Sequence, residues 1–268
     1  MTTGNGPRSL PYPSSRRLTF DVGRIGRSKH RVHALLEVDV DDARRRVKAL
    51  RRAGQPASFT AWVVKVVAES VARHPEVAAF NQPGRNRVVV FPHVDVALVI
   101  EREVDGVRVP LPYVLRGADQ ATLEAIRTEI DAARSQPVRD EGDLVLGQAR
   151  DPLGMRLFVR LPQWARLALM RATLFASPRR TMAAMGNVMV TTVGMVGRAQ
   201  GWIVPVSMHP LCLALGSLGR RPAVVNGEVV GRTMLHVTVL VDHDAVDGMP
   251  AARFVADLVK RMEGAHGL

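Results

Sequence analysis

Apolar and polar residues alternate along the chain in a way that predicts strands and helices in succession. The even-numbered positions of residues 32–40 are apolar, which is typical of a half-buried strand. Residues 41–50 begin with two aspartates and suit a helix, because acids are favourable at a helix N-terminus. Ser58 is well placed to cap a further helix that runs to about Arg73.

The same alternation continues through the middle of the chain. Residues 88–91 and 94–100 read as two strands, which are separated by a proline. A helix is predicted over residues 117–134, with Asp119 as its N-cap. Strands that alternate with helices favour a layered α/β domain.

The most informative stretch lies near the C-terminus, where a strand runs directly into a helix. Residues 235–241 are mostly apolar and β-branched on both sides, as expected of a strand that is buried on both faces. Polar residues follow at 242–244, and the apolar spacing becomes helical after Gly248. The end of a rigid strand is a good place for a reactive group, and His243 stands there.

His243, Asp247 and Gly248 form the pattern His-x-x-x-Asp-Gly at this junction. A histidine titrates near neutral pH, so His243 can act as a general base. Asp247 can be held by an arginine and so fix the loop, and Gly248 permits a tight turn into the helix. The six positions alone also fit a surface or capping histidine, and the motif by itself leaves both interpretations open.

Residues 161–176 predict a basic amphipathic helix with Pro162 in its first turn. Arginines recur on both sides of it, from Arg156 to Arg180. Its apolar face consists of Leu161, Trp164, Ala165, Ala168, Ala172 and Phe175. We expect this face to pack on protein, as a lid or a subunit contact, with an anionic membrane as the lesser alternative.

Charge and cysteine content narrow the function. The net charge of +12 favours anionic partners, but no zinc finger or other nucleic-acid motif is present, so we expect no nucleic-acid partner. The single Cys212 lies in an apolar run, which excludes an intrachain disulfide and a cysteine-built metal site, and we expect no metal. No segment has the length of a membrane span or the pattern of a signal peptide, so a cytoplasmic protein is expected.

Several motifs occur in a fixed order along the chain. They are His-Pro-Glu at 74–76, Gly-Met-Val-Gly at 194–197, Val-Val-Asn-Gly-Glu at 224–228, Asp-His at 242–243, Val-Asp-Gly at 246–248 and Ala-Ala-Arg-Phe at 251–254. This series resembles the catalytic domain of the 2-oxoacid dehydrogenase acyltransferases (E2), which are relatives of chloramphenicol acetyltransferase. Asp244 departs from that pattern, since it stands where the family has an arginine, and Met249 replaces a small residue.

The resemblance implies a role for each residue of the site. His243 would be the general base that takes a proton from a thiol. Thr191 falls where the family has a serine whose hydroxyl donates to the oxyanion, and a threonine keeps that donor. Asp247 would be held by an N-terminal arginine, and Arg16 lies about where the relatives have it.

The resemblance also implies a fold and an assembly. The fold would be the two-layer α/β fold of chloramphenicol acetyltransferase, a mixed sheet with packed helices, here with a helical insertion. We expect a flexible arm at 1–15 and a catalytic domain at 16–268, with a basic helical segment inserted at about 135–185. The chain would form a homotrimer or a higher homo-oligomer, in which His243 of one subunit works with Thr191 of the next.

Coenzyme A or acyl-CoA would be the substrate. The sequence carries no lipoyl attachment site, so the chain is expected to be a standalone form that lacks lipoyl and peripheral-subunit-binding domains. A lipoyl domain of another protein is one acceptor, and a small-molecule hydroxyl or amine is a second. A third interpretation is a catalytically silent scaffold that binds partners, which the departures at Thr191 and Asp244 motivate.

Overall fold

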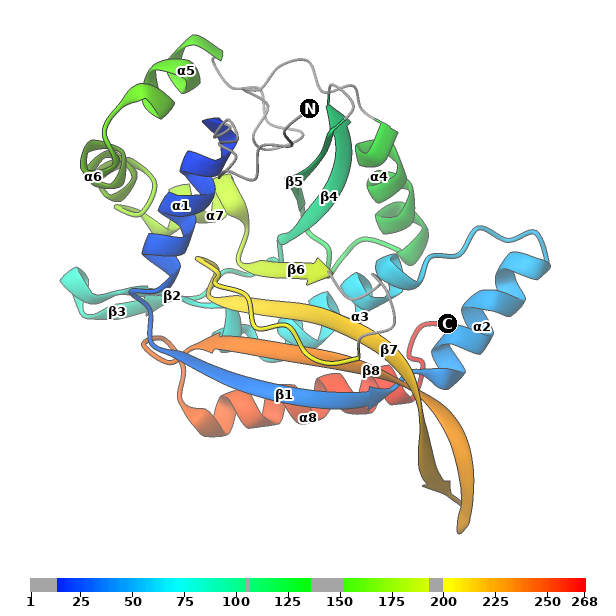
Figure 1. The fold of residues 1–268 in the computed structure, drawn as a ribbon. Coiled ribbons are helices and arrows are strands. Elements are labelled where there is room, and N and C mark those ends of the chain that lie inside the picture. The colour runs from blue at the N-terminus through cyan, green and yellow to red at the C-terminus, as the bar shows by residue number, and fades with distance from the viewer. Residues whose placement is uncertain (1–13, 105–106, 136–151, 193–199) are drawn as a thin grey trace, which may run out of the picture.

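The fold is a mixed six-stranded sheet that packs against α-helices (Figure 1). The computed structural model describes residues 14–104, 107–135, 152–192 and 200–268. The strands lie in the order β1-β8-β7-β6-β4-β5, and β6 is parallel to both of its neighbours while the other pairs are antiparallel. The strands of this sheet are β1 (Arg31–Asp39), β4 (Val96–Val104), β5 (Val107–Leu115), β6 (Val188–Thr192), β7 (Leu211–Val225) and β8 (Glu228–Asp242).

The described helices follow the predicted periodicity in most of the chain. They are α1 (Ser14–Gly26), α2 (Asp41–Arg52), α3 (Phe59–Arg73), α4 (Leu123–Ser135), α5 (Pro152–Arg160), α6 (Gln163–Thr173), α7 (Pro178–Met185) and α8 (Gly248–Glu263). A short separate hairpin consists of β2 (Phe80–Gln82) and β3 (Arg87–Val89). Among the described residues, no helix has both the length and the apolar character that crossing a membrane requires.

The main core lies between the sheet and helices α3 and α8. Trp62 of α3 is 1% exposed, and its Nε1 donates to the carbonyl of His266 at 2.8 Å, which ties the C-terminus to this core. Phe254 and Leu258 of α8 are buried in the same cluster. The predicted cap of α3 is confirmed, because the Ser58 hydroxyl accepts from the Ala61 N–H.

Strand β8 is buried on both faces from Leu235 to Asp242, as its sequence predicts. His236 is 1% exposed there and has polar partners on both sides. Its Nδ1 lies 2.9 Å from the Ser217 carbonyl oxygen, and its Nε2 lies 3.1 Å from Glu37 Oε1. These contacts satisfy a polar ring in an apolar strand.

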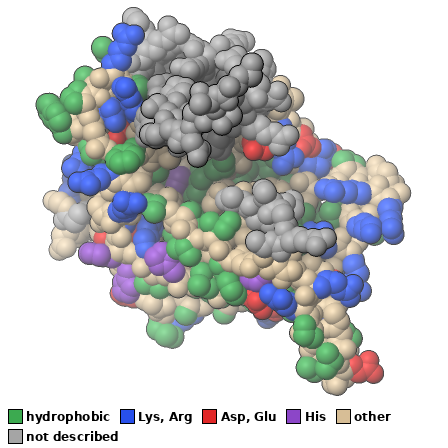
Figure 2. All heavy atoms as spheres, in the orientation of Figure 1, with side chains coloured by type: hydrophobic (Ala, Val, Ile, Leu, Met, Phe, Trp, Pro, Cys, Tyr) green, Lys and Arg blue, Asp and Glu red, His purple; other side chains and the backbone are tan. Residues whose placement is uncertain are grey.

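The hairpin of β7 and β8 extends beyond the rest of the sheet (Figures 1 and 2). Its two-residue turn consists of Asn226 and Gly227, both with positive φ, which suits the right-handed twist of the two strands. Val224 and Val229 are 72% and 74% exposed near its tip. This chain alone therefore leaves the apolar end of the hairpin uncovered.

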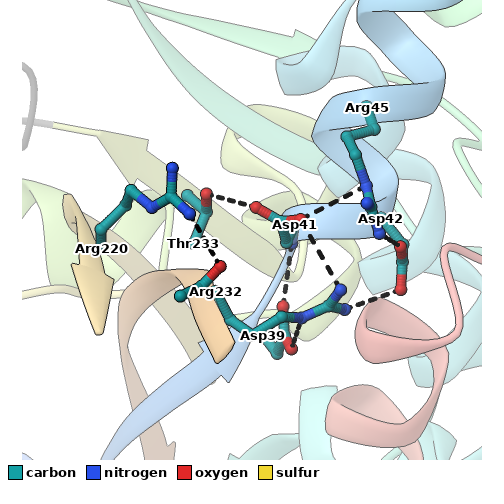
Figure 3. A network of polar contacts seen from close by, with 8 residues as sticks. Asp39, Asp41, Asp42, Arg45, Arg220, Arg232 and Thr233 are labelled. Carbon is teal, nitrogen blue, oxygen red and sulfur yellow. Dashed lines mark hydrogen bonds and ion pairs between the residues drawn. The ribbon is translucent and has the colours of Figure 1, made fainter. Parts of the chain in front are cut away.

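A cluster of ion pairs fixes the base of the hairpin to the β1–α2 junction (Figure 3). Arg232 of β8 donates to Asp39 at 2.6 Å and to Asp42 at 2.7 Å. These bonds lower the pKa of Asp42 to about 2, since Arg232 and Arg45 both donate to its carboxylate. Thr233 donates to Asp41 at 2.7 Å in the same cluster. The N-terminus of α2 is thereby held beside the sheet.

Two local predictions are wrong. The helix expected from residue 117 begins at Leu123, and Asp119 does not cap it, because its Oδ1 accepts from the Val94 N–H at 2.9 Å. The Thr122 hydroxyl accepts from the Ala125 N–H instead. Asp119 lies four residues before the helix and makes a tertiary contact, which the local sequence pattern does not reveal.

In the described part of the chain, three of the six residues of the apolar face predicted for α6 are exposed, and the other three are half-buried. Trp164 is 74% exposed, and Ala168 and Ala172 are exposed as well. The buried position of α6 is taken by Arg166, which is 5% exposed and paired with Asp21 of α1. The periodicity is right, but the helix turns its ion-pairing side inward.

Candidate active site

Strand β8 delivers His243 to the edge of the core, as predicted. The loop that follows is anchored by Val246, which is 7% exposed and belongs to the main hydrophobic cluster. The N–H groups of Ala245 and Val246 both donate to the Asp242 carbonyl, at 3.0 and 3.2 Å. The His243 side chain is exposed in this single chain. The strand therefore fixes the backbone of His243 and leaves its imidazole free to meet another surface.

Residues 29–31, just before and at the start of β1, brace this loop from the side. The Lys29 ammonium pairs with Asp242, whose carboxylate is 2% exposed. The His243 N–H donates to the His30 carbonyl at 2.9 Å. Arg31 donates to the carbonyls of Pro210, at 2.8 Å, and of neighbouring residues. Three consecutive residues thus connect the histidine loop to the segment that enters β7.

Asp244, which departs from the family pattern, has a partner of its own. Its Oδ1 lies 2.7 Å from Nδ1 of His30. This hydrogen bond and the negative charge of Asp244 raise the pKa of His30 above its usual value of 6.5. The contact therefore holds the residue after His243 most firmly when His30 is protonated.

Asp247 and Gly248 lie where the pattern places them, at the start of α8. Asp247 is the N-cap residue, and its exposed side chain makes no capping hydrogen bond. Among the described residues, no arginine or lysine pairs with the Asp247 carboxylate. Arg16 belongs to α1, and its side chain lies outside the described residues, so the predicted Arg16–Asp247 contact stays a prediction. A Cβ on Gly248 would meet nothing within 4 Å in this chain.

The structure does not bring Thr191 to His243 within one chain. Thr191 of β6 pairs with Ala214 of β7, which pairs in turn with Thr238 of β8. His243 follows Thr238 by five positions. Thr191 and His243 are therefore separated by two strand spacings across the sheet and by five residues along the strand direction. At about 4.8 Å per strand and about 3.4 Å per residue, the separation is about 20 Å. A hydroxyl and an imidazole that act on one bond cannot be so far apart.

Two adjoining open grooves lie near Lys29, between the β2–β3 hairpin and the residues around Pro178. Their volumes are about 390 and 580 Å³, and they share Arg85 and Gln82. Neither groove is lined by His243 or Thr191. Among the described residues, no group of three or more histidine, cysteine or acidic side chains is arranged to hold a metal.

Cys212 is not a candidate nucleophile. It is 1% exposed in β7, and burial raises the pKa of its thiol to about 11. The thiol therefore stays protonated at neutral pH. Cys212 is a small core residue, as its apolar surroundings in the sequence indicate.

Sequence reasoning missed the brace at residues 29–31 and the role of Asp242. The available signal was the basic run Arg27, Lys29, His30 and Arg31 immediately before a strand. Strand β1 pairs with β8 so that Arg31 stands opposite Asp242. Predicting that pairing requires knowing which strands are neighbours in the sheet, and periodicity alone does not show the strand order.

The sheet order, the helices packed against it and the histidine loop at the end of β8 define a fold class that known acyltransferase cores share. The cubic core of a pyruvate dehydrogenase multienzyme complex superposes with a TM-score of 0.68 at 15% identity, covering 97% of this chain and 93% of that one. Dihydrolipoamide acetyltransferase from Azotobacter vinelandii gives a TM-score of 0.68 at 15% identity, with the same coverage. At these identities the superpositions show the fold.

The sequence profile described as 2-oxoacid dehydrogenases acyltransferase (catalytic domain) matches residues 25–140 and 180–268. The chain therefore belongs to the family of 2-oxoacid dehydrogenase acyltransferase catalytic domains. A curated relative is the dihydrolipoyllysine-residue acetyltransferase component of the pyruvate dehydrogenase complex of Mycoplasma pneumoniae, 26% identical over 217 residues. The match covers 80% of this chain and 44% of that relative, so the chain spans less than half of its length.

Proposed function

We propose that this protein transfers an acyl group between coenzyme A and a thiol, with His243 as the general base. Membership of an acyltransferase family makes acyl transfer the first expectation. A free thiol has a pKa of about 8.5, so a base near neutral pH is needed to make the thiolate that attacks the thioester. His243 suits this role because its backbone is fixed by β8 and its side chain is exposed.

The observation that carries the proposal is a shared spacing. In the Azotobacter vinelandii enzyme, one serine, one histidine and one asparagine have been studied for their role in the catalytic mechanism. That serine and histidine are 52 positions apart, and the asparagine follows the histidine by four. Thr191, His243 and Asp247 have the same separations in this chain. Equal spacing across a shared fold supports the assignment of all three.

The proposed site is completed by a second copy of the chain. The separation of about 20 Å between Thr191 and His243 in one subunit argues that they belong to two different sites. A cubic core has threefold axes at its corners, so a trimer is the natural unit. Thr191 of one subunit would donate its hydroxyl to the oxyanion that forms beside His243 of the next.

Replacing His243 tests the proposal directly. We expect His243→Ala to lower kcat for release of free CoA from acetyl-CoA, with dihydrolipoamide as the acceptor, by about 10²- to 10⁴-fold, because general-base catalysis contributes about that much. The KM for acetyl-CoA should change little, since the imidazole acts on the reacting thiol. Release of CoA is followed with a thiol reagent after the acceptor has been separated.

The matched control is His93→Ala, which removes another exposed histidine, 3.1 Å from Gln120 and outside the proposed site. This variant should keep the activity of the natural sequence. Equal rates for His243→Ala and the natural sequence would remove His243 from the mechanism. If acetyl-CoA also failed to bind, the silent scaffold would be the better interpretation.

A further inference from the structure

Helices α1, α5, α6 and α7 form a group at one corner of the molecule (Figure 1). The family profile leaves out residues 141–179, so α5 and α6 lie in a part of the chain that it does not match. Arg17 of α1 donates to the Val159 carbonyl of α5 at 3.1 Å. Asp21 of α1 accepts from Arg166 of α6 at 2.6 and 3.0 Å and from Gln163 at 3.2 Å. These contacts fix α1 against α5 and α6.

The one buried residue of α6 is therefore an arginine, and the opposite side of the helix carries mainly apolar residues. Arg166 points inward, and each residue of an α-helix turns by about 100°, so Trp164 and Ala168 lie about 200° away from it, on the opposite side. Arg171 and Ala172 fall on that outward side as well, and all four residues are exposed. An amphipathic helix normally buries its apolar face, and the described residues leave much of this face uncovered, so a binding partner is expected there.

Exposed apolar side chains occur on all three helices that these contacts join. Phe20 of α1 is 62% exposed, Leu157 of α5 is 66% exposed, and Trp164 and Leu169 of α6 are 74% and 42% exposed. Figure 2 shows hydrophobic and basic side chains side by side at this corner. Exposed apolar side chains that lie together are typical of a binding face, whereas single apolar side chains scattered over a surface are ordinary.

The exposed charges on the four helices are all positive. Asp21 is their only acidic residue, and it is fully buried in its pair with Arg166. Six exposed arginines lie on the four helices, and they are Arg17, Arg24, Arg160, Arg171, Arg179 and Arg180. The absence of exposed acids applies to these four helices only. Residues 136–151, outside the described part of the chain, carry four acidic residues in the sequence.

We propose that the outward face of α1, α5 and α6 rests on an anionic membrane surface. A bilayer with acidic lipids offers negative charge throughout, which matches an acid-free basic surface, whereas a protein partner usually offers both signs. Trp164 and Phe20 would enter the headgroup region, where aromatic side chains are favoured, while the arginines contact lipid phosphates. With eleven residues, α6 is too short to span the hydrocarbon core and would lie along the surface.

The test is flotation of the full chain with vesicles of phosphatidylcholine alone and with vesicles that also contain phosphatidylglycerol. We expect binding only to the anionic vesicles, and expect it to weaken at high salt. Trp164→Ser should weaken the partition by about tenfold, because it removes an interfacial aromatic anchor. Arg160→Gln with Arg171→Gln should weaken it by about tenfold or more, because each arginine near the surface adds to the attraction.

Matched controls separate this surface from a general effect of positive charge. Val229→Ser removes an equally exposed apolar side chain from the hairpin, and Arg52→Gln with Arg253→Gln removes two exposed arginines from α2 and α8. These controls should bind as the natural sequence does. Circular dichroism should show that Trp164→Ser unfolds at the same temperature, since the side chain is mostly exposed.

Absence of binding to the anionic vesicles would overturn the proposal. It would also be overturned if the control variants weakened binding as much as the variants of α5 and α6. A change of oligomeric state in Trp164→Ser, measured by light scattering without lipid, would assign the face to a protein contact instead.

Discussion

At the scale of single residues, the sequence predicts the position of His243 but not the side chains that hold its loop. The strand pattern and the His-x-x-x-Asp-Gly spacing both follow from local sequence, so the end of β8 could be predicted. Lys29 and His30 are more than 200 positions away from Asp242 and Asp244 in the chain. Their contacts depend on the pairing of β1 with β8, which local pattern does not determine.

The pair of His30 and Asp244 makes the histidine loop sensitive to pH. The pKa of His30 in the folded chain lies above its usual value of 6.5, so the contact contributes fully below about pH 6.5 and is lost as the pH rises through the folded-state pKa. Asp244→Asn should bring the pKa of His30 back toward 6.5, because it removes the charged acceptor. A histidine titration by NMR measures this shift, with His30→Gln to identify the resonance.

The control for this prediction is Glu228→Gln, which removes an exposed carboxylate at the turn of the distant β7–β8 hairpin. It should leave the titration of His30 unchanged. An unaltered His30 titration in Asp244→Asn would show that the two side chains do not pair in solution.

At the scale of elements, the predicted strands and helices are present in the structure with ends that shift by a few residues, while α1 has no predicted counterpart. Helix α6 shows the limit of that reasoning. Periodicity identifies which residues share a face, but it does not say which face meets the protein. In α6 the outcome is decided by the ion pair between Arg166 and Asp21, whose side chains are 6% and 0% exposed. A helix with several arginines gives no sequence signal for which of them is buried.

Breaking this ion pair should release α6 from α1. We expect Asp21→Asn to destabilise the contact by about 3–5 kcal/mol, because Arg166 would stay buried without its counter-charge. Limited trypsin digestion at low urea should then cut the chain within α5–α6 much faster, and urea unfolding followed by circular dichroism gives the global effect.

Two comparisons check that interpretation. Asp21→Leu with Arg166→Met replaces the pair by apolar side chains and should restore most of the resistance to trypsin. Asp131→Asn breaks exposed pairs on α4 and should change stability by less than about 1 kcal/mol. If Asp21→Asn were as resistant as the natural sequence, the pair would not hold α6 in place.

At the scale of the whole molecule, the candidate site is divided between distant parts of one subunit. Thr191 and His243 follow from resemblance in the sequence, but their separation of about 20 Å follows only from the sheet order. The sequence of one chain does not directly show whether a second copy of the chain contributes to the site. The expectation of a homotrimer therefore rests on the family and is consistent with this separation.

Mixing two inactive variants tests the division of the site. Thr191→Ala and His243→Ala should each be impaired alone, the first by about 100-fold if its hydroxyl is an oxyanion donor. When the two are unfolded together and refolded into mixed trimers, about a quarter of the sites should combine an intact threonine with an intact histidine. CoA release should then recover to about a quarter of the natural rate. A mixture no more active than its two components would contradict a shared site.

If the proposed shared site is correct, the distance between Thr191 and His243 would also separate folding from activation. A newly made subunit would complete its core, its β8 strand and its histidine loop while it was still unable to stabilise a tetrahedral intermediate. Such a subunit would not hydrolyse thioester before it met a second copy. Reactivity would then be a property of the assembled particle, and control of assembly would control it.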